Sequence, residues 1–205
     1  MIVVLGSSTA AGTGPTRPEN AWVERYRSYL RQAFPKFQLI NLAVGGYTTY
    51  EIQPADYAPP RDRPRPDGNH DITKALAENA DAIIINLPSN DQASSFSLAE
   101  QLANYDRVVE LGARRGVSFW VTTPQPRNFS GAAQRHELFL ARDAIQQKFG
   151  DHTLDFWHPF AEKDGAIKRS FDSGDGTHLN DDAHALLARQ LIQAKIPEAI
   201  LRARP

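Results

Sequence analysis

The sequence contains no cysteine and only one methionine among its 205 residues. The lack of cysteine excludes disulfide bonds, thiolate metal sites and a cysteine nucleophile, so serine or a carboxylate would have to carry any covalent chemistry. No apolar run approaches the ~20 residues that a membrane-spanning helix needs. The formal net charge is only −1, with acidic and basic residues interspersed, which argues against a nucleic-acid or membrane-surface partner bound by charge.

The length and the composition predict a single soluble domain. A chain of 205 residues with 41% hydrophobic residues is long enough to bury one full-sized core. Met1 lies directly against the first apolar run, with no charged leader before it. We therefore expect either a cytoplasmic protein or a mature secreted or periplasmic form whose signal peptide was removed. The sequence leaves both open, along with the oligomeric state.

Apolar runs that are typical of buried strands alternate with helical patterns along the chain. The predicted strands are residues 2–5, 37–42, 82–87, 117–122 and 153–156, and the predicted helices are residues 19–34, 71–79, 97–115, 131–149 and 180–194. This alternation is typical of a parallel sheet covered on both faces. We therefore predict a three-layer α/β/α sandwich around a five-stranded parallel sheet, with functional groups in the loops at the carboxyl ends of its strands.

The segment from residue 48 to residue 71, TTYEIQPADYAPPRDRPRPDGNHD, interrupts the alternation. It is rich in proline, tyrosine and arginine and is longer than an ordinary connection between a strand and a helix. Long ordered loops often carry function. We interpret the segment as an insertion that forms a pocket wall, and a solvated surface excursion is the alternative.

The first predicted strand breaks into small residues in the stretch IVVLGSSTAAGTG. A glycine-rich loop after a strand can bind phosphate, but Gly6 and Gly12 lack the Lys-Ser/Thr ending of a P-loop, and the third glycine of the dinucleotide fingerprint is missing after Gly14. The stretch GSSTA also fails to complete a G-x-S-x-G nucleophile elbow. We therefore expect no nucleotide cofactor here. A serine at this place, taken alone, would most simply cap a helix or a turn.

Three distant segments give the serine another interpretation. NLAVGGYTT follows the second predicted strand, INLPSND ends the third, and DGTHLNDDAH precedes the last helix. Together with the first stretch, they make the sequence resemble the SGNH (or GDSL) hydrolases, whose four short blocks occur in the same order at equivalent strand ends. The resemblance spans residues 6–178 and implies the flavodoxin-like SGNH-hydrolase fold.

The resemblance assigns a role to one residue of each block. It implies that Ser8 is the nucleophile, that His178 is its general base and that Asp175 orients the histidine. It places the oxyanion hole at the backbone N–H of Ser8, the backbone N–H of Gly46 and the side-chain amide of Asn90. Gly45 is an adjacent alternative to Gly46.

Two positions depart from the family pattern, and one motif occurs twice. Ser7 stands where the family has aspartate, and Pro88 stands where it has glycine, which removes a backbone N–H. A second Asp-x-x-His sequence, Asp181 to His184, lies in the predicted last helix. We favour Asp175 and His178 as the catalytic pair, because they match the family setting, and we interpret the second pair as a helix face.

The family implies a serine esterase that works through an acyl-serine intermediate and needs no cofactor. We expect a small-molecule or carbohydrate substrate, with a short acyl group of the acetyl type on a sugar. The stretch TTPQPRN follows the fourth predicted strand, so Gln125, Arg127 and Asn128 are candidate substrate contacts, and a proline-rigid surface loop is the alternative.

Other functions stay open. A lipase, a thioesterase or an acyltransferase could use the same site, and a non-catalytic carbohydrate-binding protein could share the fold. The acidic residues between Asp172 and Asp182 could suggest a metal site, but glycines occupy positions where an EF-hand loop needs oxygen ligands. We therefore expect no metal.

Overall fold

A parallel sheet of five strands forms the centre of the computed structural model, which describes residues 1–203. The strands are β1 (Ile2–Gly6), β2 (Leu39–Asn41), β3 (Ala82–Asn86), β4 (Ser118–Thr122) and β5 (Thr153–Leu154). Their order is β2-β1-β3-β4-β5, and every neighbouring pair is parallel. The predicted sheet is therefore confirmed, although β2 and β5 are shorter than predicted. Both are edge strands, which form hydrogen bonds to a neighbour on one side only.

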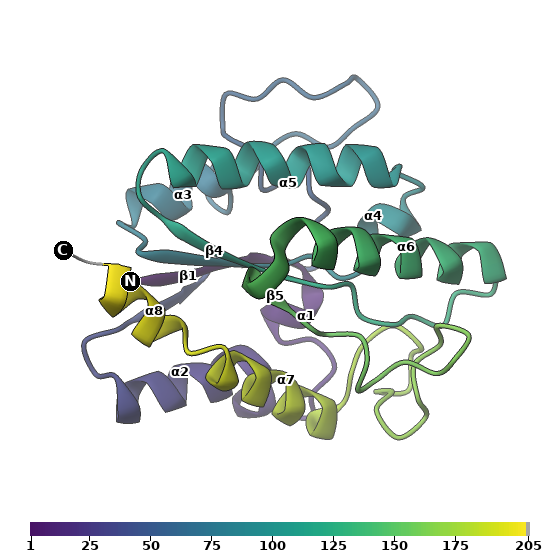
Figure 1. Cartoon of the computed structure of the whole chain (residues 1–205). Coiled ribbons are helices and arrows are strands. Elements are labelled where there is room, and N and C mark those ends of the chain that lie inside the picture. Colours follow the sequence, from purple (N-terminus) through teal and green to yellow (C-terminus); the bar gives the residue numbers. More distant parts are fainter. Residues whose placement is uncertain (204–205) are drawn as a thin grey trace.

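Helices cover both faces of the sheet (Figure 1). They are α1 (Ser8–Ala11), α2 (Trp22–Ala33), α3 (Ile72–Ala77), α4 (Asn90–Ala93), α5 (Leu98–Ala113), α6 (Ala132–Phe149), α7 (Asp181–Gln193) and α8 (Ile196–Ala203). Three of these helices begin at a polar N-cap residue. The side chains of Asp71, Ser97 and Asn180 accept hydrogen bonds from backbone N–H groups in the first turns of α3, α5 and α7. The five predicted helices are confirmed, and α1, α4 and α8 are additional.

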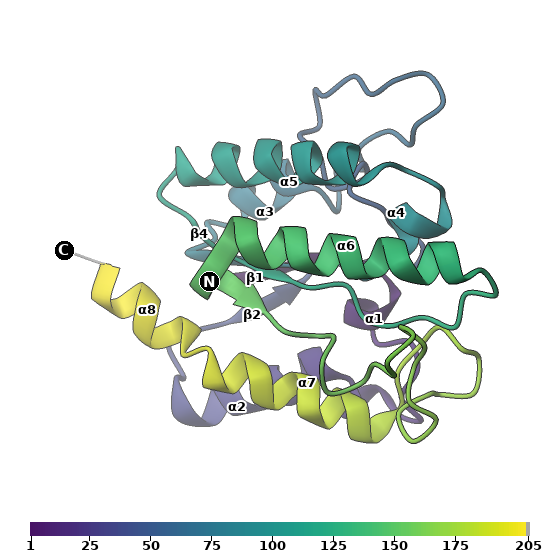
Figure 2. The same cartoon turned by 45° about the vertical axis from the view of Figure 1, so that its right-hand side comes forward.

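Alternate residues of the central strands point to opposite layers, so the sheet separates two apolar cores. Val4 and Ile84 face one core, to which α2, α7 and α8 contribute. Val3 and Ile83 face the other, to which α3, α5 and α6 contribute. Figures 1 and 2 show these helices as two layers on either side of the strands. The predicted α/β/α sandwich is thus observed.

The segment 48–71 forms an ordered loop that contains neither a helix nor a strand. It lies over α5 at the top of Figure 1. Arg63 binds Glu100 of α5 at 2.7 Å, and Tyr50 donates a hydrogen bond to the same carboxylate at 2.9 Å. The guanidinium of Arg107 on α5 stacks on the ring of Tyr57, 4.1 Å from its centroid. Ionic and cation–π contacts therefore anchor this loop to one helix.

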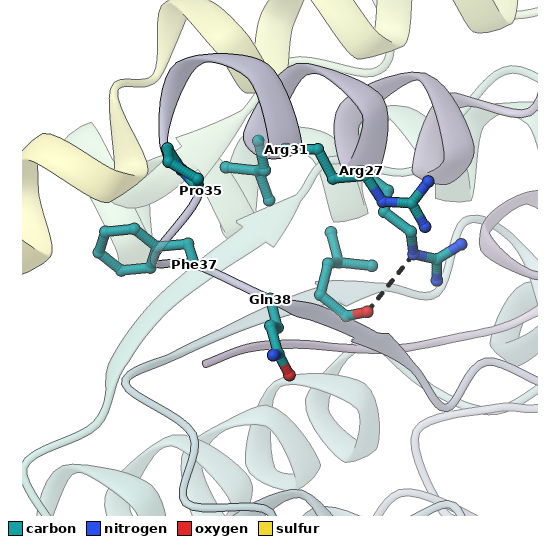
Figure 3. Close-up of a pocket in the computed structure, with 7 residues that line it drawn as sticks. Arg27, Arg31, Pro35, Phe37 and Gln38 are labelled. Carbon is teal, nitrogen blue, oxygen red and sulfur yellow. Dashed lines mark hydrogen bonds between the residues drawn. The ribbon is translucent and has the colours of Figure 1, made fainter.

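A cavity of about 420 Å³ lies between the end of α2 and the start of β2 (Figure 3). Arg27, Arg31, Pro35, Phe37 and Gln38 line it, and Arg27 Nε donates a hydrogen bond across it to the backbone oxygen of Leu39 at 3.4 Å. The cavity is at the amino end of the strand. Ligand sites of parallel sheets lie at the carboxyl ends, so we place the functional site at the opposite edge.

The two-core arrangement predicts how substitutions affect stability. Ile84 is completely buried in the central strand β3, so we expect Ile84→Ala to lower the free energy of unfolding by about 2–5 kcal/mol through lost burial and a new cavity. Urea denaturation measures this change. Leu201→Ala is the control, because that side chain is 50% exposed and its loss should change stability by less than about 0.5 kcal/mol. Equal losses would contradict the assigned core.

Candidate active site

The loops that carry the predicted catalytic residues meet at the carboxyl edge of the sheet. Ser8 is the first residue of α1, which directly follows β1, and Asn90 is the first residue of α4, which follows β3. Because β1 and β3 are paired in parallel, these two loops leave the sheet side by side. His178 reaches them from the loop that precedes α7.

A chain of hydrogen bonds joins the serine, the histidine and the aspartate. His178 Nε2 lies 2.9 Å from Ser8 Oγ, and His178 Nδ1 lies 2.6 Å from Asp175 Oδ2. Asp175 Oδ1 also accepts the backbone N–H groups of Thr177 and His178. Burial would raise the pKa of Asp175, but the hydrogen bonds from His178 and Thr177 outweigh it and hold that pKa well below its usual range. The carboxylate is therefore ionised and fixes the imidazole tautomer.

The sequence analysis assigned no structural role to Gly14, which lets the loop after α1 approach the loop that carries His178. Gly14 has a φ of +113°, which L side chains rarely adopt, and a Cβ there would lie 2.2 Å from the backbone oxygen of Leu179 and 3.1 Å from His178 Cβ. Only glycine therefore fits between the loop after α1 and the loop that carries the histidine. Its place six residues after Ser8, directly before Pro15, is the signal that could have indicated a turn.

The three predicted oxyanion donors are the backbone N–H of Ser8, the backbone N–H of Gly46 and the side-chain amide of Asn90. Within the described residues, neither the backbone N–H of Ser8 nor that of Gly46 is used in a hydrogen bond. Gly46 has a φ of +88° and an open space where a Cβ would point, while a Cβ on Gly45 would lie 3.9 Å from Ser8 Cβ. Asn90 Nδ2 donates to the backbone oxygen of Tyr47 at 2.9 Å, so that its amide is held against this glycine turn. The amide keeps a second N–H.

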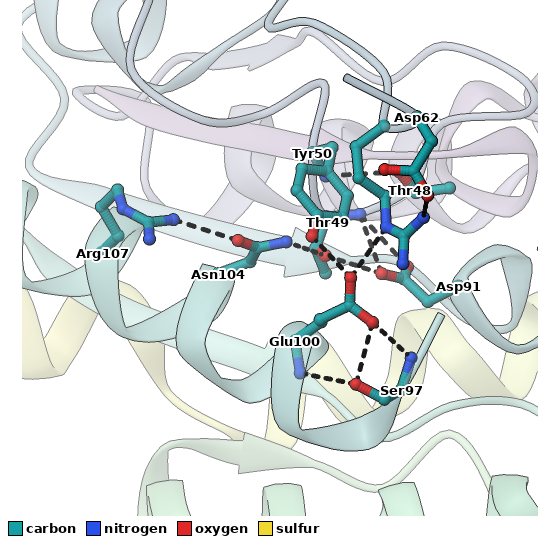
Figure 4. A network of polar contacts seen from close by, with 10 residues as sticks. Thr48, Thr49, Tyr50, Asp62, Asp91, Ser97, Glu100, Asn104 and Arg107 are labelled. Carbon is teal, nitrogen blue, oxygen red and sulfur yellow. Dashed lines mark hydrogen bonds and ion pairs between the residues drawn. The ribbon is translucent and has the colours of Figure 1, made fainter. Parts of the chain in front are cut away.

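A buried carboxylate connects the glycine turn to α4 (Figure 4). Asp91 is 1% exposed and accepts hydrogen bonds from the backbone N–H and the hydroxyl of Thr49. Asn104 of α5 donates to the same hydroxyl at 2.9 Å, and Arg107 donates to the Asn104 oxygen at 3.0 Å. This network fixes the segment after Gly46 relative to the helix that begins at Asn90.

The two departures from the family pattern have local consequences. Ser7 is completely buried, its backbone N–H donates to Asn86 O at 3.0 Å, and its hydroxyl makes no hydrogen bond within the described residues. Gly6 before it passes so close to β3 that a Cβ would lie 2.6 Å from that same oxygen. With Pro88 in place of glycine, α4 still begins at Asn90.

The structure gives the three predicted substrate contacts different roles. Gln125 is 1% exposed; its amide accepts from Thr9 Oγ1 at 2.9 Å and donates to the backbone oxygen of Thr177 at 2.8 Å. A direct substrate contact by Gln125 is therefore wrong, because its amide is buried and bridges α1 to the histidine loop. Asn128 is also occupied, since it bonds to Asp172 and to the backbone of Ile167.

Arg127 differs from its two neighbours in the same loop. Its guanidinium donates one hydrogen bond, to Ser89 Oγ at 3.3 Å, and stacks on the ring of Phe129. Ser89 directly precedes Asn90. Of the three predicted contacts, Arg127 therefore keeps the largest number of donors for a ligand beside the site.

Two other histidines show that the Asp-x-x-His spacing alone does not make a site. His184 is completely buried, and its Nδ1 accepts the backbone N–H of Trp22 at 3.0 Å. Burial lowers the pKa of His184 to about 3, so it stays neutral at neutral pH. His158 binds Asp155 at 2.6 Å in the same way as His178 binds Asp175, but no serine is hydrogen-bonded to it within the described residues.

The described residues contain no group of three or more histidine, aspartate and glutamate side chains arranged to hold a metal ion. Between residues 1 and 203, no helix has the length and apolar character needed to cross a bilayer.

The close approach at Gly14 generates a prediction about activity. We expect Gly14→Ala to lower kcat about 100-fold, because the new methyl group must push the histidine loop away from Ser8. Steady-state kinetics with a p-nitrophenyl ester measures this loss. Gly68→Ala is the matched control, because its Cβ would point into open space, and equal kcat values for the two variants would refute the constraint.

The buried carboxylate of Asp91 generates a prediction about pH. Burial raises the pKa of Asp91 to about 7, above the ~3.9 of an unfolded chain. The folded protein therefore holds a proton that the unfolded chain releases, so the stability from this group is full below pH ~4 and is lost as the pH rises through ~7. We expect the unfolding free energy of the wild type to fall relative to that of Asp91→Asn between these pH values, as guanidinium titrations would show. A constant difference would contradict the assignment.

Comparisons with known proteins identify a family for this chain. The profile of the GDSL-like Lipase/Acylhydrolase family matches residues 4–186. A search of curated proteins finds no match.

Solved structures with the same fold include the psychrotrophic esterase EstA from a Pseudoalteromonas species, with a TM-score of 0.66, 18% identity and 94% of each chain covered. TesA aligns with a TM-score of 0.70 and 16% identity, covering 96% of this chain and 98% of that chain. A two-domain esterase active on acetylated mannans aligns with a TM-score of 0.62 and 16% identity over 98% of this chain and 48% of that chain. Because the family profile covers most of the sequence, the chain belongs to the GDSL-like Lipase/Acylhydrolase family and is an ester-hydrolysing enzyme.

Proposed function

We propose that this enzyme is a serine esterase in which Ser8, His178 and Asp175 form the catalytic triad. The observation that carries the proposal is the continuous hydrogen-bond chain, with 2.9 Å between Ser8 Oγ and His178 Nε2 and 2.6 Å between His178 Nδ1 and Asp175 Oδ2. A serine hydroxyl becomes an effective nucleophile only when a neighbouring base accepts its proton during attack.

In the first half of the reaction, Ser8 Oγ bonds to the carbonyl carbon of the ester while its proton passes to His178 Nε2. Asp175 stabilises the imidazolium that forms. The carbonyl oxygen becomes an anion, which the N–H groups of Ser8, Gly46 and Asn90 stabilise. The C–O bond to the alcohol then breaks, His178 returns the proton to the leaving oxygen, and an acyl-serine remains.

In the second half, His178 accepts a proton from water as the water oxygen attacks the acyl-serine. The second tetrahedral intermediate uses the same donors. When the bond to Ser8 Oγ breaks, His178 returns the proton to this oxygen, and the free acid leaves. Each step of this cycle is carried out by side chains and backbone N–H groups of the protein together with water.

We propose a short acyl group on a carbohydrate as the substrate. The residues that follow β2, β3 and β4 at the carboxyl edge of the sheet include the small or polar groups Gly45, Gly46, Asn90 and the Arg127 guanidinium, which suit a small acyl group and a hydroxyl-rich alcohol better than a long alkyl chain. The likeness to an esterase active on acetylated mannans supports the same substrate class.

Substitution of the triad tests the mechanism. We expect Ser8→Ala and His178→Gln each to lower kcat by about 10⁴-fold or more, because the nucleophile or its base is lost. His158→Gln is the matched control, since it removes an imidazole that is held by an aspartate in the same geometry but is not bonded to a serine. Hydrolysis of p-nitrophenyl acetate measures all three, and full activity in Ser8→Ala would refute the proposal.

A series of esters tests the substrate class. We expect kcat/KM to fall from p-nitrophenyl acetate through butyrate to octanoate, and acetate to be released from acetylated xylan or mannan. A preference for octanoate would indicate a lipase or a thioesterase instead. Transfer of the acyl group to an added sugar in place of water would indicate an acyltransferase. Binding of the sugar polymer without hydrolysis would indicate a carbohydrate-binding protein.

A further inference from the structure

Arg127 occupies a loop whose backbone is held on both sides. Gln125, two residues earlier, is bonded to α1 and to the loop that carries His178. On the other side, the backbone N–H of Asn128 donates to Gly176 O at 2.8 Å. The start of the Arg127 side chain is therefore fixed relative to both the nucleophile and the base, and ordering it for a ligand costs little entropy.

The guanidinium reaches across to the end of the neighbouring strand. Its Nη1 atom donates to Ser89 Oγ at 3.3 Å, and Ser89 directly precedes α4 in the segment that follows β3. Strand β3 lies between β4 and β1, and adjacent strands are about 4.8 Å apart. The guanidinium of Arg127 therefore lies beside the segment that follows β3, and β3 is the sheet neighbour of β1, which directly precedes Ser8.

The charge of Arg127 has no carboxylate partner within the described residues. A guanidinium has five N–H donors, and the described part of the chain uses one of them. Asp175 is close enough to interact electrostatically, but its oxygens bond to His178 and Thr177, and no ion pair joins it to Arg127 between residues 1 and 203.

Two other partly buried arginines, Arg25 and Arg107, each donate two hydrogen bonds to amide or backbone oxygens, and four more are paired with carboxylates. Each of the following has a carboxylate within salt-bridge distance: Arg27, Arg63, Arg135 and Arg142. Burial lowers the pKa of Arg127, which reflects the cost of removing its charge from water. A bound anion would offset that cost.

We propose that Arg127 binds a carboxylate carried by the ester substrate, so that the enzyme prefers anionic esters. This inference rests on the proposed function, because the guanidinium defines a subsite only if Ser8 is the nucleophile. A planar guanidinium with free donors matches a carboxylate through two parallel hydrogen bonds. The carboxylate can belong to the alcohol half, as in an acetylated uronic acid, or to the acyl half, as in the monoester of a dicarboxylic acid.

Two matched pairs of esters test the inference. Acetylated methyl glucuronide and acetylated methyl glucoside differ in a carboxylate on the alcohol half, and p-nitrophenyl hydrogen adipate and p-nitrophenyl hexanoate differ in one on the acyl half. The readout is the ratio of kcat/KM for the anionic ester to that for the neutral ester. We expect Arg127→Gln to lower this ratio about 10- to 100-fold in one pair, which identifies the half that carries the carboxylate.

Two further variants control for charge alone. Arg127→Lys keeps the charge without the paired donors and should lower the ratio by an intermediate amount. Arg65→Gln removes an equal charge from an exposed position in the loop 48–71 and should leave the ratio unchanged. If Arg65→Gln and Arg127→Gln lower the ratio equally, the net charge of the protein sets the preference and Arg127 forms no specific subsite. That result would overturn the proposal.

The remaining outcomes separate this inference from the proposed function. If the wild type has no preference in either pair, or Arg127→Gln lowers both kcat/KM values equally, Arg127 is structural and the inference fails. In that case the loss of hydrolysis in Ser8→Ala would still support the serine esterase. If Ser8→Ala hydrolyses the neutral esters as fast as the wild type, the proposed function itself fails.

Discussion

The hydrogen bond between Ser8 and His178 depends on a loop that is held from several sides. The two residues are 170 positions apart, and no regular element connects them directly. Residues 172–179 turn back on themselves, with Asp172 paired to Leu179 and the backbone N–H of Ser173 donating to His178 O. Gln125 holds this loop to α1, and Gly14 allows the segment after α1 to approach it. The position of His178 is therefore a property of tertiary packing.

The environment of each histidine decides its chemistry, because spacing to an aspartate is shared by all three pairs. His184 lies in the core, where burial keeps it neutral and its Nδ1 accepts from the start of α2. His158 has an aspartate partner but is exposed on the surface. His178 alone combines an aspartate on one ring nitrogen with a serine on the other. A general base needs both contacts, since one sets the tautomer and the other receives the proton.

Buried polar groups also connect the site to the outer layer of the protein. Asp91 and Thr49 bond in the interior, and Asn104 and Arg107 extend this network along α5 to the loop 48–71. A hydrogen-bonded interior group resists displacement, because breaking its bonds leaves an unsatisfied polar atom. This network thereby holds the predicted oxyanion donors at Gly46 and Asn90 relative to each other. The loop 48–71 contributes to it through the contact between Tyr57 and Arg107.

The periodicity of apolar residues was sufficient to predict the layers and the sheet, because a buried parallel strand leaves a continuous apolar run and an amphipathic helix a repeat near 3.6 residues. It overestimated the lengths of β2 and β5, since edge strands end where pairing on one side becomes unfavourable, which depends on the neighbouring strand.

The four short motifs also identified residues that lie together at one edge of the sheet. The sequence pattern made Gln125 a candidate substrate contact, whereas packing buried its side chain as a bridge between α1 and the histidine loop. The order of residue types along the chain thus determined the architecture and the chemistry available at the strand ends. Only the tertiary structure showed which of the three Asp-x-x-His pairs is hydrogen-bonded to a serine and which polar side chains are buried, because burial, backbone approach and hydrogen-bond partners arise from contacts between segments far apart in the chain.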